Sequence, residues 1–197
     1  MTQATFLTLP PTADWPEQGA WTYEDYLRLP DDGRRYEIIK GVLYVANAPG
    51  ADHQFTVLEI AYQIKAFLRE NPLGFVLTAP FEVHLAEDTR PVQPDVLFIA
   101  SSKWPGSEAR FFEGAPDLVA EVLSPSTSRK DRVTKFTVYE QTGVTEYWIV
   151  NPKTRSVEVF TLSGQEYALV GEFVADNMIE SKVLTGLQIR TSSLFAS

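Results

Sequence analysis

The longest periodic run of apolar residues in the chain lies between Asp52 and Pro72. Its apolar positions recur at intervals of three and four residues, which is the spacing of one face of an α-helix. Asp52 is placed to cap the start and Asn71-Pro72 to end the pattern, so we predict one long amphipathic helix. The apolar positions are Val57, Ile60, Ala61, Ile64, Phe67 and Leu68.

A second helical pattern is shorter and follows later in the chain. Ser128 and Asp131 fit a capping box at its start. Phe136 and Tyr139 continue an apolar face until Gly143, a residue type that commonly ends helices. We therefore predict a second helix that begins near Asp131 and ends at Gly143.

The rest of the chain is dominated by patterns typical of β-strands. The segment 116–124 is apolar almost without a break around Glu121, as in a strand that is covered on both faces. The segment 36–49 predicts two strands around a turn at Lys40-Gly41. Strands combined with two principal helices predict an α/β (α+β) fold with a mixed sheet. The other β-rich segments are 74–86, 92–100, 145–151, 155–162 and 166–173.

The first 20 residues contain Pro10, Pro11 and Pro16 and show no apolar periodicity, so we expect residues 1–20 to form an extended arm. Thr22 can then cap a short helix that ends at Pro30. The remaining length fits a single domain at residues 21–197.

The opening residues do not resemble a secretory signal, no apolar run is long enough for a membrane helix, and cysteine is absent. We expect a cytoplasmic protein with no membrane partner.

The net charge of −9 disfavours strong, sequence-independent binding to nucleic acid. Residues 125–155 differ, because basic side chains outnumber acidic ones there. A solvated helix face and a surface that contacts phosphate both explain this local excess. The basic residues are Arg129, Lys130, Arg132, Lys135, Lys153 and Arg155.

Two acidic residues stand in apolar surroundings. Glu121 lies within the strand pattern LVAEVLS, and Asp95 alternates with Leu97 and Ile99. An ionised carboxylate in such a place is costly unless it is paired, hydrogen-bonded or bound to a metal. Carboxylates without thiolates form a hard oxygen site that suits Mg²⁺ or Mn²⁺, whereas ordinary salt bridges are the alternative explanation.

Several motifs, in this order, resemble one known family. They are RRYEIIKG, GADHQ at the start of the long helix, QPDVLFI, GAPDLVAEVLSPST followed by a D-x-x-x-K helix, and GVTEYWIVNP. They cover about residues 21 to 195 and resemble the Uma-type restriction-endonuclease family of the PD-(D/E)XK nuclease superfamily. The resemblance implies a restriction-endonuclease-like mixed sheet flanked by helices, Mg²⁺ or Mn²⁺ as cofactor, DNA as substrate and a homodimer.

The resemblance also implies roles for individual residues. Asp95 and Glu121 match the acidic pair that binds the metal, and the backbone carbonyl of Val122 would be a further ligand. The superfamily's lysine ordinarily stands two residues after the second acid, but Leu123 occupies that position here, and Lys135 on the next helix is the match. The metal would activate water while Lys135 stabilises negative charge in the transition state.

Glu37 matches an upstream acid that the family places beside the metal. It would either orient Lys135 or ligate the metal. The alternative is a simple ion pair at the strand edge with Arg34 or Arg35.

Three residues are candidate contacts to nucleic acid. Arg129 and Lys130 stand near the start of the second helix, where they are either phosphate contacts or simple surface charge. His53 stands at the positive end of the long helix, where it would meet a phosphate or the outer shell of the metal, or merely cap the helix. His84 has no acidic partner in its own motif, so we predict a structural role for it.

The leading function is therefore a metal-dependent endonuclease that acts on DNA. A catalytically silent DNA- or protein-binding module on the same fold is the second hypothesis, since Leu123 replaces the usual lysine and the chain is acidic overall. A phosphoesterase for small substrates is the third, and nothing beyond the two acids supports it.

Overall fold

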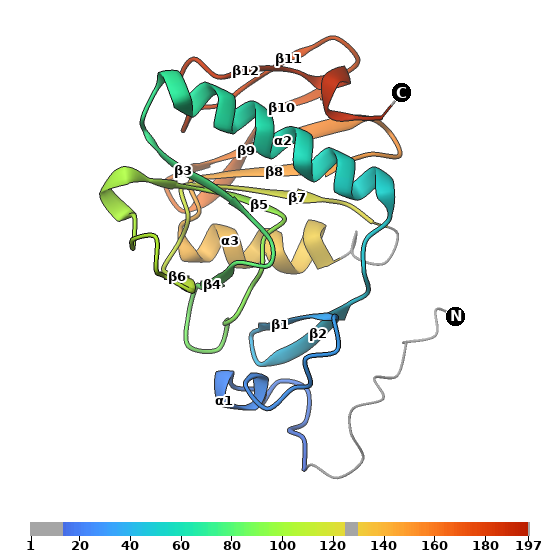
Figure 1. Ribbon diagram of the computed structural model, residues 1–197, viewed down its shortest axis with the longest axis vertical. Helices are drawn as coiled ribbons and strands as arrows, with labels where there is room; N and C mark the ends of the chain where they lie inside the picture. Colours follow the sequence, from blue (N-terminus) through green and yellow to red (C-terminus); the bar gives the residue numbers. More distant parts are fainter. Residues whose placement is uncertain (1–13, 125–129, 197) are drawn as a thin grey trace.

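The computed structural model describes residues 14–124 and 130–196, and a six-stranded sheet lies at the centre of this part (Figure 1). The strand order is β10-β9-β8-β7-β5-β3. β7 and β8 run parallel and the other neighbouring pairs run antiparallel, so the sheet is mixed, as predicted. The strands are β3 (Gly74–Thr78), β5 (Val96–Ala100), β7 (Leu118–Val122), β8 (Glu146–Asn151), β9 (Ser156–Ser163) and β10 (Glu166–Val174).

Helices cover both faces of the sheet. The predicted long helix is α2 (Ala51–Glu70), which buries Ile60 and Ile64 against Phe98 and Trp148. The helix α3 (Phe136–Thr142) packs on the opposite face and buries Tyr139 (Figure 1). Side chains alternate between the two faces along each strand, so β5 and β7 contribute to both cores.

A β-hairpin and a short helix lie at one end of the domain, near the beginning of the chain. The hairpin strands are β1 (Arg35–Ile39) and β2 (Val42–Ala46), with the predicted turn at Lys40-Gly41. The helix is α1 (Tyr23–Tyr26), and Thr22 caps it together with Asp25. Residues before this helix also pack here, since Trp15 stacks on Trp21 with ring centroids 5.5 Å apart.

The structure differs from the sequence prediction at several elements. The segment 74–86 divides into β3 and β4 (Glu82–His84), because Pro80 has no N–H to continue the ladder. β4 pairs in parallel with β6 (Phe111–Glu113), which the sequence pattern did not reveal. The hairpin β11 (Met178–Glu180) and β12 (Gln188–Arg190) and the short 3₁₀ helices η1 (Ser101–Lys103) and η3 (Thr191–Leu194) were also not predicted.

The second predicted helix begins differently from the prediction. Lys130–Lys135 (η2) form a π-helical turn that leads directly into α3, and Gly143 ends α3 in the left-handed conformation, as predicted. The proposed cap Ser128 lies outside the described residues. Among the helices of the described segments, none is long and apolar enough to cross a membrane.

Candidate active site

The two predicted acids meet where β5 and β7 stop pairing. Val96 of β5 stands opposite Ala120 of β7 in antiparallel register. One step further along the same register, Asp95 stands opposite Glu121. Residues opposite one another on antiparallel strands project from the same face of the sheet. The ends of these two strands therefore bring Asp95 and Glu121 together.

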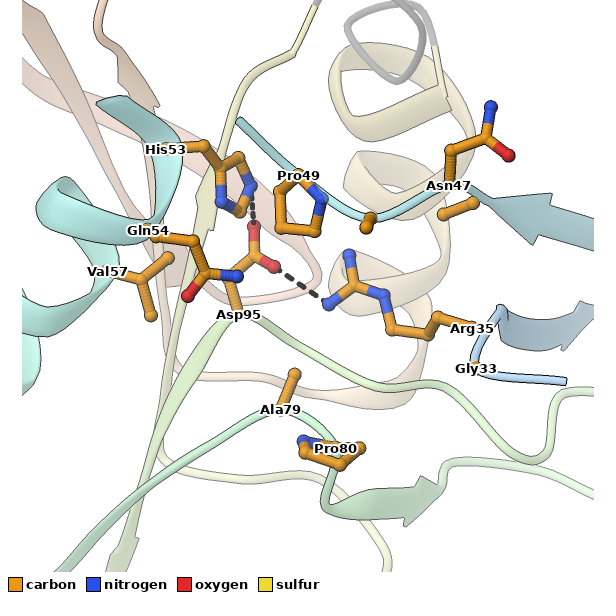
Figure 2. Close-up of a pocket in the computed structure, with 12 residues that line it drawn as sticks. Gly33, Arg35, Asn47, Pro49, His53, Gln54, Val57, Ala79, Pro80 and Asp95 are labelled. Carbon is orange, nitrogen blue, oxygen red and sulfur yellow. Dashed lines mark hydrogen bonds and ion pairs between the residues drawn. The ribbon is translucent and has the colours of Figure 1, made fainter. Parts of the chain in front are cut away.

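Asp95 is buried and both of its carboxylate oxygens accept hydrogen bonds. Arg35 Nη1 lies 2.9 Å from Oδ1, and His53 Nε2 and the backbone N of Val122 lie 3.1 Å and 2.9 Å from Oδ2. Figure 2 shows the carboxylate between His53 and Arg35. Burial raises the pKa of Asp95, but the hydrogen bond from His53 and the charge of Arg35 outweigh burial and lower the pKa to about 2.

Glu121 has a different electrostatic environment. Its Oε1 accepts hydrogen bonds from Lys135 Nζ and from the hydroxyl of Tyr139, each at 2.7 Å. Burial raises the pKa of Glu121 to about 7 against the attraction of Lys135, and the nearby acids, Asp95 first among them, raise it further. The folded protein therefore disfavours the ionised form of Glu121, whereas it favours the ionised form of Asp95.

Lys135 is buried among acids although its residue type is ordinarily exposed. Its Nζ lies 2.7 Å from Glu121, 2.9 Å from Glu37 and 4.0 Å from Asp131. Burial lowers the pKa of Lys135, but the charges of Glu121, Glu37 and Asp131 outweigh burial and raise the pKa above its usual value. The ammonium therefore stays protonated at neutral pH.

Glu37 is held by two lysines. Lys130 Nζ lies 2.6 Å from Oε2 and Lys135 Nζ lies 2.9 Å from Oε1, while the backbone N of Gln93 donates to Oε1 at 2.9 Å. Burial raises the pKa of Glu37, but the charges of Lys130, Lys135 and Arg35 lower it well below its usual range. The alternative pairing of Glu37 with Arg34 or Arg35 is not seen, because Arg34 binds Asp32 and Arg35 binds Asp95.

The π-helical turn explains how two lysines reach one carboxylate. In an α-helix of 3.6 residues per turn, positions five residues apart project about 140° apart around the axis. The wider turn, with its bonds between residues five apart, brings Lys130 and Lys135 to the same side. The interpretation of Lys130 as simple surface charge is thus wrong, since its ammonium is mostly buried against Glu37.

The structure brings most of the predicted site residues to one place. Glu37, Asp95, Glu121, Lys135 and His53 form this group together with Lys130, and Val122 donates its N–H to Asp95. Arg129 lies outside the described residues. Leu123 is buried in the apolar core, so it contributes no charge to the site.

Arg35, Asp131 and Tyr139 are members of the site that the sequence prediction missed. Arg35 entered the sequence prediction only as a surface partner of Glu37. Asp131 and Tyr139 were assigned only a capping and an apolar role. The RRYE motif and the short distance along the helix from Asp131 to Lys135 are the signals that would have found Arg35 and Asp131.

A hollow of about 210 Å³ opens beside Asp95. Figure 2 shows its wall, with Arg35 and His53 on either side of Asp95 and with Asn47 and Gln54 nearby. Polar and charged groups on this wall can contact a ligand with phosphate or hydroxyl oxygens. Asp95 is the member of the acidic cluster that lines this hollow.

The chemistry of the donor atoms fits a hard divalent cation. Asp95 and Glu121 offer carboxylate oxygens, which Mg²⁺ and Mn²⁺ prefer. In the described residues, no group of three or more His, Asp or Glu side chains is arranged to hold a metal. A set with two acids, the carbonyl of Val122 and water remains compatible with Mg²⁺, which usually keeps several waters.

Comparisons with known proteins identify the family. A family model, Uma2, described as a putative restriction endonuclease, matches residues 23–192. The chain belongs to the Uma2 family. A search of curated proteins finds no match.

A solved structure also resembles this Uma2 protein. It is the crystal structure of a putative nuclease belonging to DUF820 from Anabaena variabilis ATCC 29413. The two proteins share 21% sequence identity, with a TM-score of 0.75, and the match covers 88% of this chain and 97% of the other. This comparison supports the restriction-endonuclease-like fold that the sequence predicted.

Proposed function

We propose that this Uma2 protein is a metal-dependent endonuclease that hydrolyses phosphodiester bonds in DNA. The observation that carries the proposal is the buried ammonium of Lys135, fixed between Glu121 and Glu37 beside Asp95. A buried lysine surrounded by acids is costly to maintain for stability alone, because both signs of charge must leave water. A cation held next to two convergent carboxylates suits chemistry on a phosphate.

Asp95, Glu121 and the carbonyl of Val122 would hold Mg²⁺ or Mn²⁺. When bound, such an ion lowers the pKa of a water molecule and polarises a phosphodiester. Lys135 would place its positive charge against the negative charge that develops on the phosphate. It acts as a cation and not as a base, because the surrounding acids raise its pKa.

The remaining residues would hold these groups in position. Glu37 holds the ammonium of Lys135 together with Glu121, and Lys130 balances the charge of Glu37. Arg35 and His53 orient the carboxylate of Asp95. Since Lys130 is occupied by Glu37, we assign it to this supporting role in preference to contact with DNA.

Two further features complete the proposal. Cleavage of both strands of a duplex usually uses one active site for each strand, so we propose a homodimer, as the family resemblance implies. The absence of cysteine and the net charge of −9 are compatible with a cytoplasmic protein that engages DNA through local contacts.

A catalytically silent binding module is the alternative. One observation favours it: both oxygens of Asp95 already accept hydrogen bonds from Arg35, His53 and Val122. A metal ion would have to share or displace these contacts. The distinction between the two functions therefore depends on metal binding and cleavage.

The decisive experiment incubates supercoiled, linear, branched and single-stranded DNA with the protein and Mn²⁺. Asp95→Ala, purified identically, exposes any contaminating nuclease. We expect cleavage of at least one substrate by the wild type and a rate lower by roughly 100-fold or more in Asp95→Ala. Equal cleavage by both proteins would refute the proposal. Absence of cleavage by a wild type that binds Mn²⁺ in a calorimeter would favour the silent binding module.

A further inference from the structure

The guanidinium of Arg35 has hydrogen-bond donors that the protein does not use. Within residues 14–124 and 130–196 its hydrogen-bond partner is Asp95 alone, which accepts from Nη1 at 2.9 Å. Neither Nε nor Nη2 is among the buried polar atoms that lack a partner in these residues, so both are open to solvent. The side chain is accordingly 21% exposed. Nε and Nη2 form one edge of the planar group, which can donate two parallel hydrogen bonds to one acceptor group.

These free donors belong to the wall of the hollow beside Asp95. Arg35 contributes to this wall from the start of β1, and His53 and Gln54 contribute from α2. Figure 2 shows that one terminal nitrogen of Arg35 faces Asp95 and that the other is turned away from it. Among the described residues of the wall, Arg35 and Asp95 are the only side chains of Asp, Glu, Lys or Arg type. The hollow therefore contains a fixed cation with open donors and no acid except the one that fixes it.

The charge of the surrounding cluster indicates which ligand would suit these donors. When all of its acids are ionised, the described part of the cluster has four negative and three positive charges, which leaves one net negative charge. A bound divalent ion would change this to one net positive charge. A phosphodiester carries one negative charge and would neutralise it. The acids are Glu37, Asp95, Glu121 and Asp131, and the cations are Arg35, Lys130 and Lys135.

We propose that Arg35 binds the non-bridging oxygens of a nucleic-acid phosphodiester in this hollow, through the N–H groups that Asp95 leaves free. The identity of the substrate rests on the proposed function. One guanidinium would contact the phosphate and Asp95 through different nitrogens. It would thus hold the phosphate beside the carboxylate that we assign to the metal, and Arg35 would bind substrate in addition to orienting Asp95.

The same geometry makes Arg35 a competitor of the metal ion. Its Nη1 occupies Oδ1 of Asp95, one of the two oxygens that this carboxylate can offer a cation. Removal of the guanidinium should therefore raise the affinity for metal while it lowers the affinity for phosphate. A residue that only positions Asp95 would behave differently, because loss of a positioning contact weakens metal binding and leaves phosphate binding unchanged.

The first test titrates dimethyl phosphate, a phosphodiester with one negative charge, into the Mg²⁺-saturated protein at pH 8 and constant ionic strength. In NMR spectra of the arginine side chains, the Nε–H signal of Arg35 should shift. Arg35→Gln should weaken binding by about tenfold, since it removes a charge-assisted contact. Arg35→Lys should weaken it by about threefold or more although the charge remains, because one ammonium nitrogen lacks the planar edge. In EDTA, binding should be weaker and should still depend on Arg35, since the cluster then keeps its net negative charge.

Arg34→Gln is the matched control. It removes the same charge from the neighbouring residue, whose guanidinium binds Asp32 and does not line the hollow. Because solvent and salt screen a charge that makes no contact, this variant should weaken dimethyl phosphate binding by less than about twofold. If Arg34→Gln and Arg35→Gln weaken binding alike, or if Arg35→Lys binds as the wild type does, the proposal is refuted. Absence of an Nε–H shift with Mg²⁺ and in EDTA refutes it as well.

The second test measures the affinity for Mn²⁺ by calorimetry at pH 8 without phosphate. Arg35→Gln should raise this affinity by about tenfold, whereas Arg35→Lys, which keeps a cation near Asp95, should change it by less than about threefold. A lower Mn²⁺ affinity together with an unchanged phosphate affinity would identify a positioning residue and overturn the proposal. Urea unfolding shows whether each variant is folded, and Arg35→Lys carries the test if Arg35→Gln is not.

These outcomes can be separated from those of the proposed function. Binding of dimethyl phosphate through Arg35 in a protein that cleaves no DNA would refute the nuclease and leave the phosphate contact in place. Cleavage of DNA by the wild type, with a phosphate affinity that neither Arg35→Gln nor Arg35→Lys changes, would refute the phosphate contact alone.

Discussion

Two buried histidines lie beside carboxylates in this protein, and their surroundings differ. His84 contacts a carboxylate through each ring nitrogen, Glu82 and Glu113, both at 3.3 Å. The expectation that His84 has no acidic partner in its own motif is therefore wrong, since Glu82 lies on the same strand. The ring of His84 also stacks on Phe111 with centroids 4.3 Å apart. His53 contacts Asp95 through one nitrogen, and the other has no partner in the described part of the chain.

The acidic residues of the two regions also differ in how far hydrogen-bond donors, cations or water compensate their charge. Glu82 accepts hydrogen bonds from Tyr23 and Tyr26 as well as facing His84, and Glu113 is largely exposed to water. In the region of Asp95, buried acids outnumber the cations that face them. The acids are Glu37, Asp95, Glu121 and Asp131, and the cations are Arg35, Lys130 and Lys135.

The comparison shows which region is arranged for a ligand. Around His84, protein groups satisfy the polar atoms, as in a structural cluster. Around Asp95, one carboxyl group has a raised pKa and one imidazole nitrogen has no partner. A divalent cation would favour the ionised carboxyl group, and a hydrogen-bond donor such as water would satisfy the imidazole nitrogen. Perturbed groups of this kind gather at functional sites, and three experiments test whether the difference is functional.

The largest expected effect is on the rate of DNA cleavage by Lys135→Met. This change removes the ammonium and keeps an apolar side chain of similar length. We expect the single-turnover rate at saturating Mn²⁺ to fall by roughly 100- to 10,000-fold, because the lost charge acts on the transition state. His84→Gln, in the other region, should change the rate less than about threefold.

Lys130→Met is the sharper control because Lys130 binds the same carboxylate of Glu37. It should lower the rate much less than Lys135→Met, since Lys130 supports the cluster without facing Glu121. A loss in Lys130→Met as large as that in Lys135→Met would transfer the catalytic role to Lys130. Urea unfolding of each variant shows whether a lower rate merely reflects a lower fraction of folded protein.

The second effect concerns the affinity for Mn²⁺ as a function of pH. Metal binding must displace the proton from Glu121, whose pKa burial raises to about 7. The affinity should therefore rise by up to about tenfold per pH unit between pH 5 and 7 and level off above pH 7. Calorimetry in two buffers with different ionisation enthalpies measures the released proton. An affinity that does not change between pH 5 and 8 would contradict a role for Glu121 as a ligand.

Much of the fold could be predicted from the sequence because its largest elements have regular patterns. The apolar spacing of α2 and the continuous apolar run of β7 both depend on burial, which local sequence records directly. The short strand β6 and its pairing with β4 could not be predicted. The two strands pair with each other across a gap in the sequence, and three residues carry too little periodicity.

Asp95 and Glu121 could be singled out as candidates because a carboxylate in an apolar strand is unusual. Lys135 was found through family resemblance and not through its own pattern. The ion pairs of Lys130 and Lys135 with the same carboxylate, Glu37, could not be predicted. They depend on a π-helical turn, and no local sequence pattern indicates such a turn. The unpaired nitrogen of His53 likewise depends on tertiary contacts.

The smallest expected effect is on the stability of the metal-free protein, and it has opposite signs in the two regions. Burial raises the pKa of Glu121 above its unfolded value, so the stability from its protonated form is complete below about pH 4.5 and is lost as the pH rises through about 7. Burial also raises the pKa of Glu82, but hydrogen bonds from His84 and the tyrosines lower it overall. Glu82 therefore stabilises when ionised and loses its contribution as the pH falls.

Glu121→Gln should accordingly raise the free energy of unfolding at pH 8 by about 1–3 kcal/mol, while Glu82→Gln should lower it by about 1 kcal/mol. Both changes keep the size of the side chain and remove its charge. Urea titrations in EDTA at pH 5 and pH 8 measure the two effects, and the gain from Glu121→Gln should shrink at pH 5, where the wild-type carboxyl is already protonated. If both variants are destabilised at pH 8, Glu121 serves as the partner of a structural ion pair with Lys135, and the contrast between the two histidine regions loses its functional meaning.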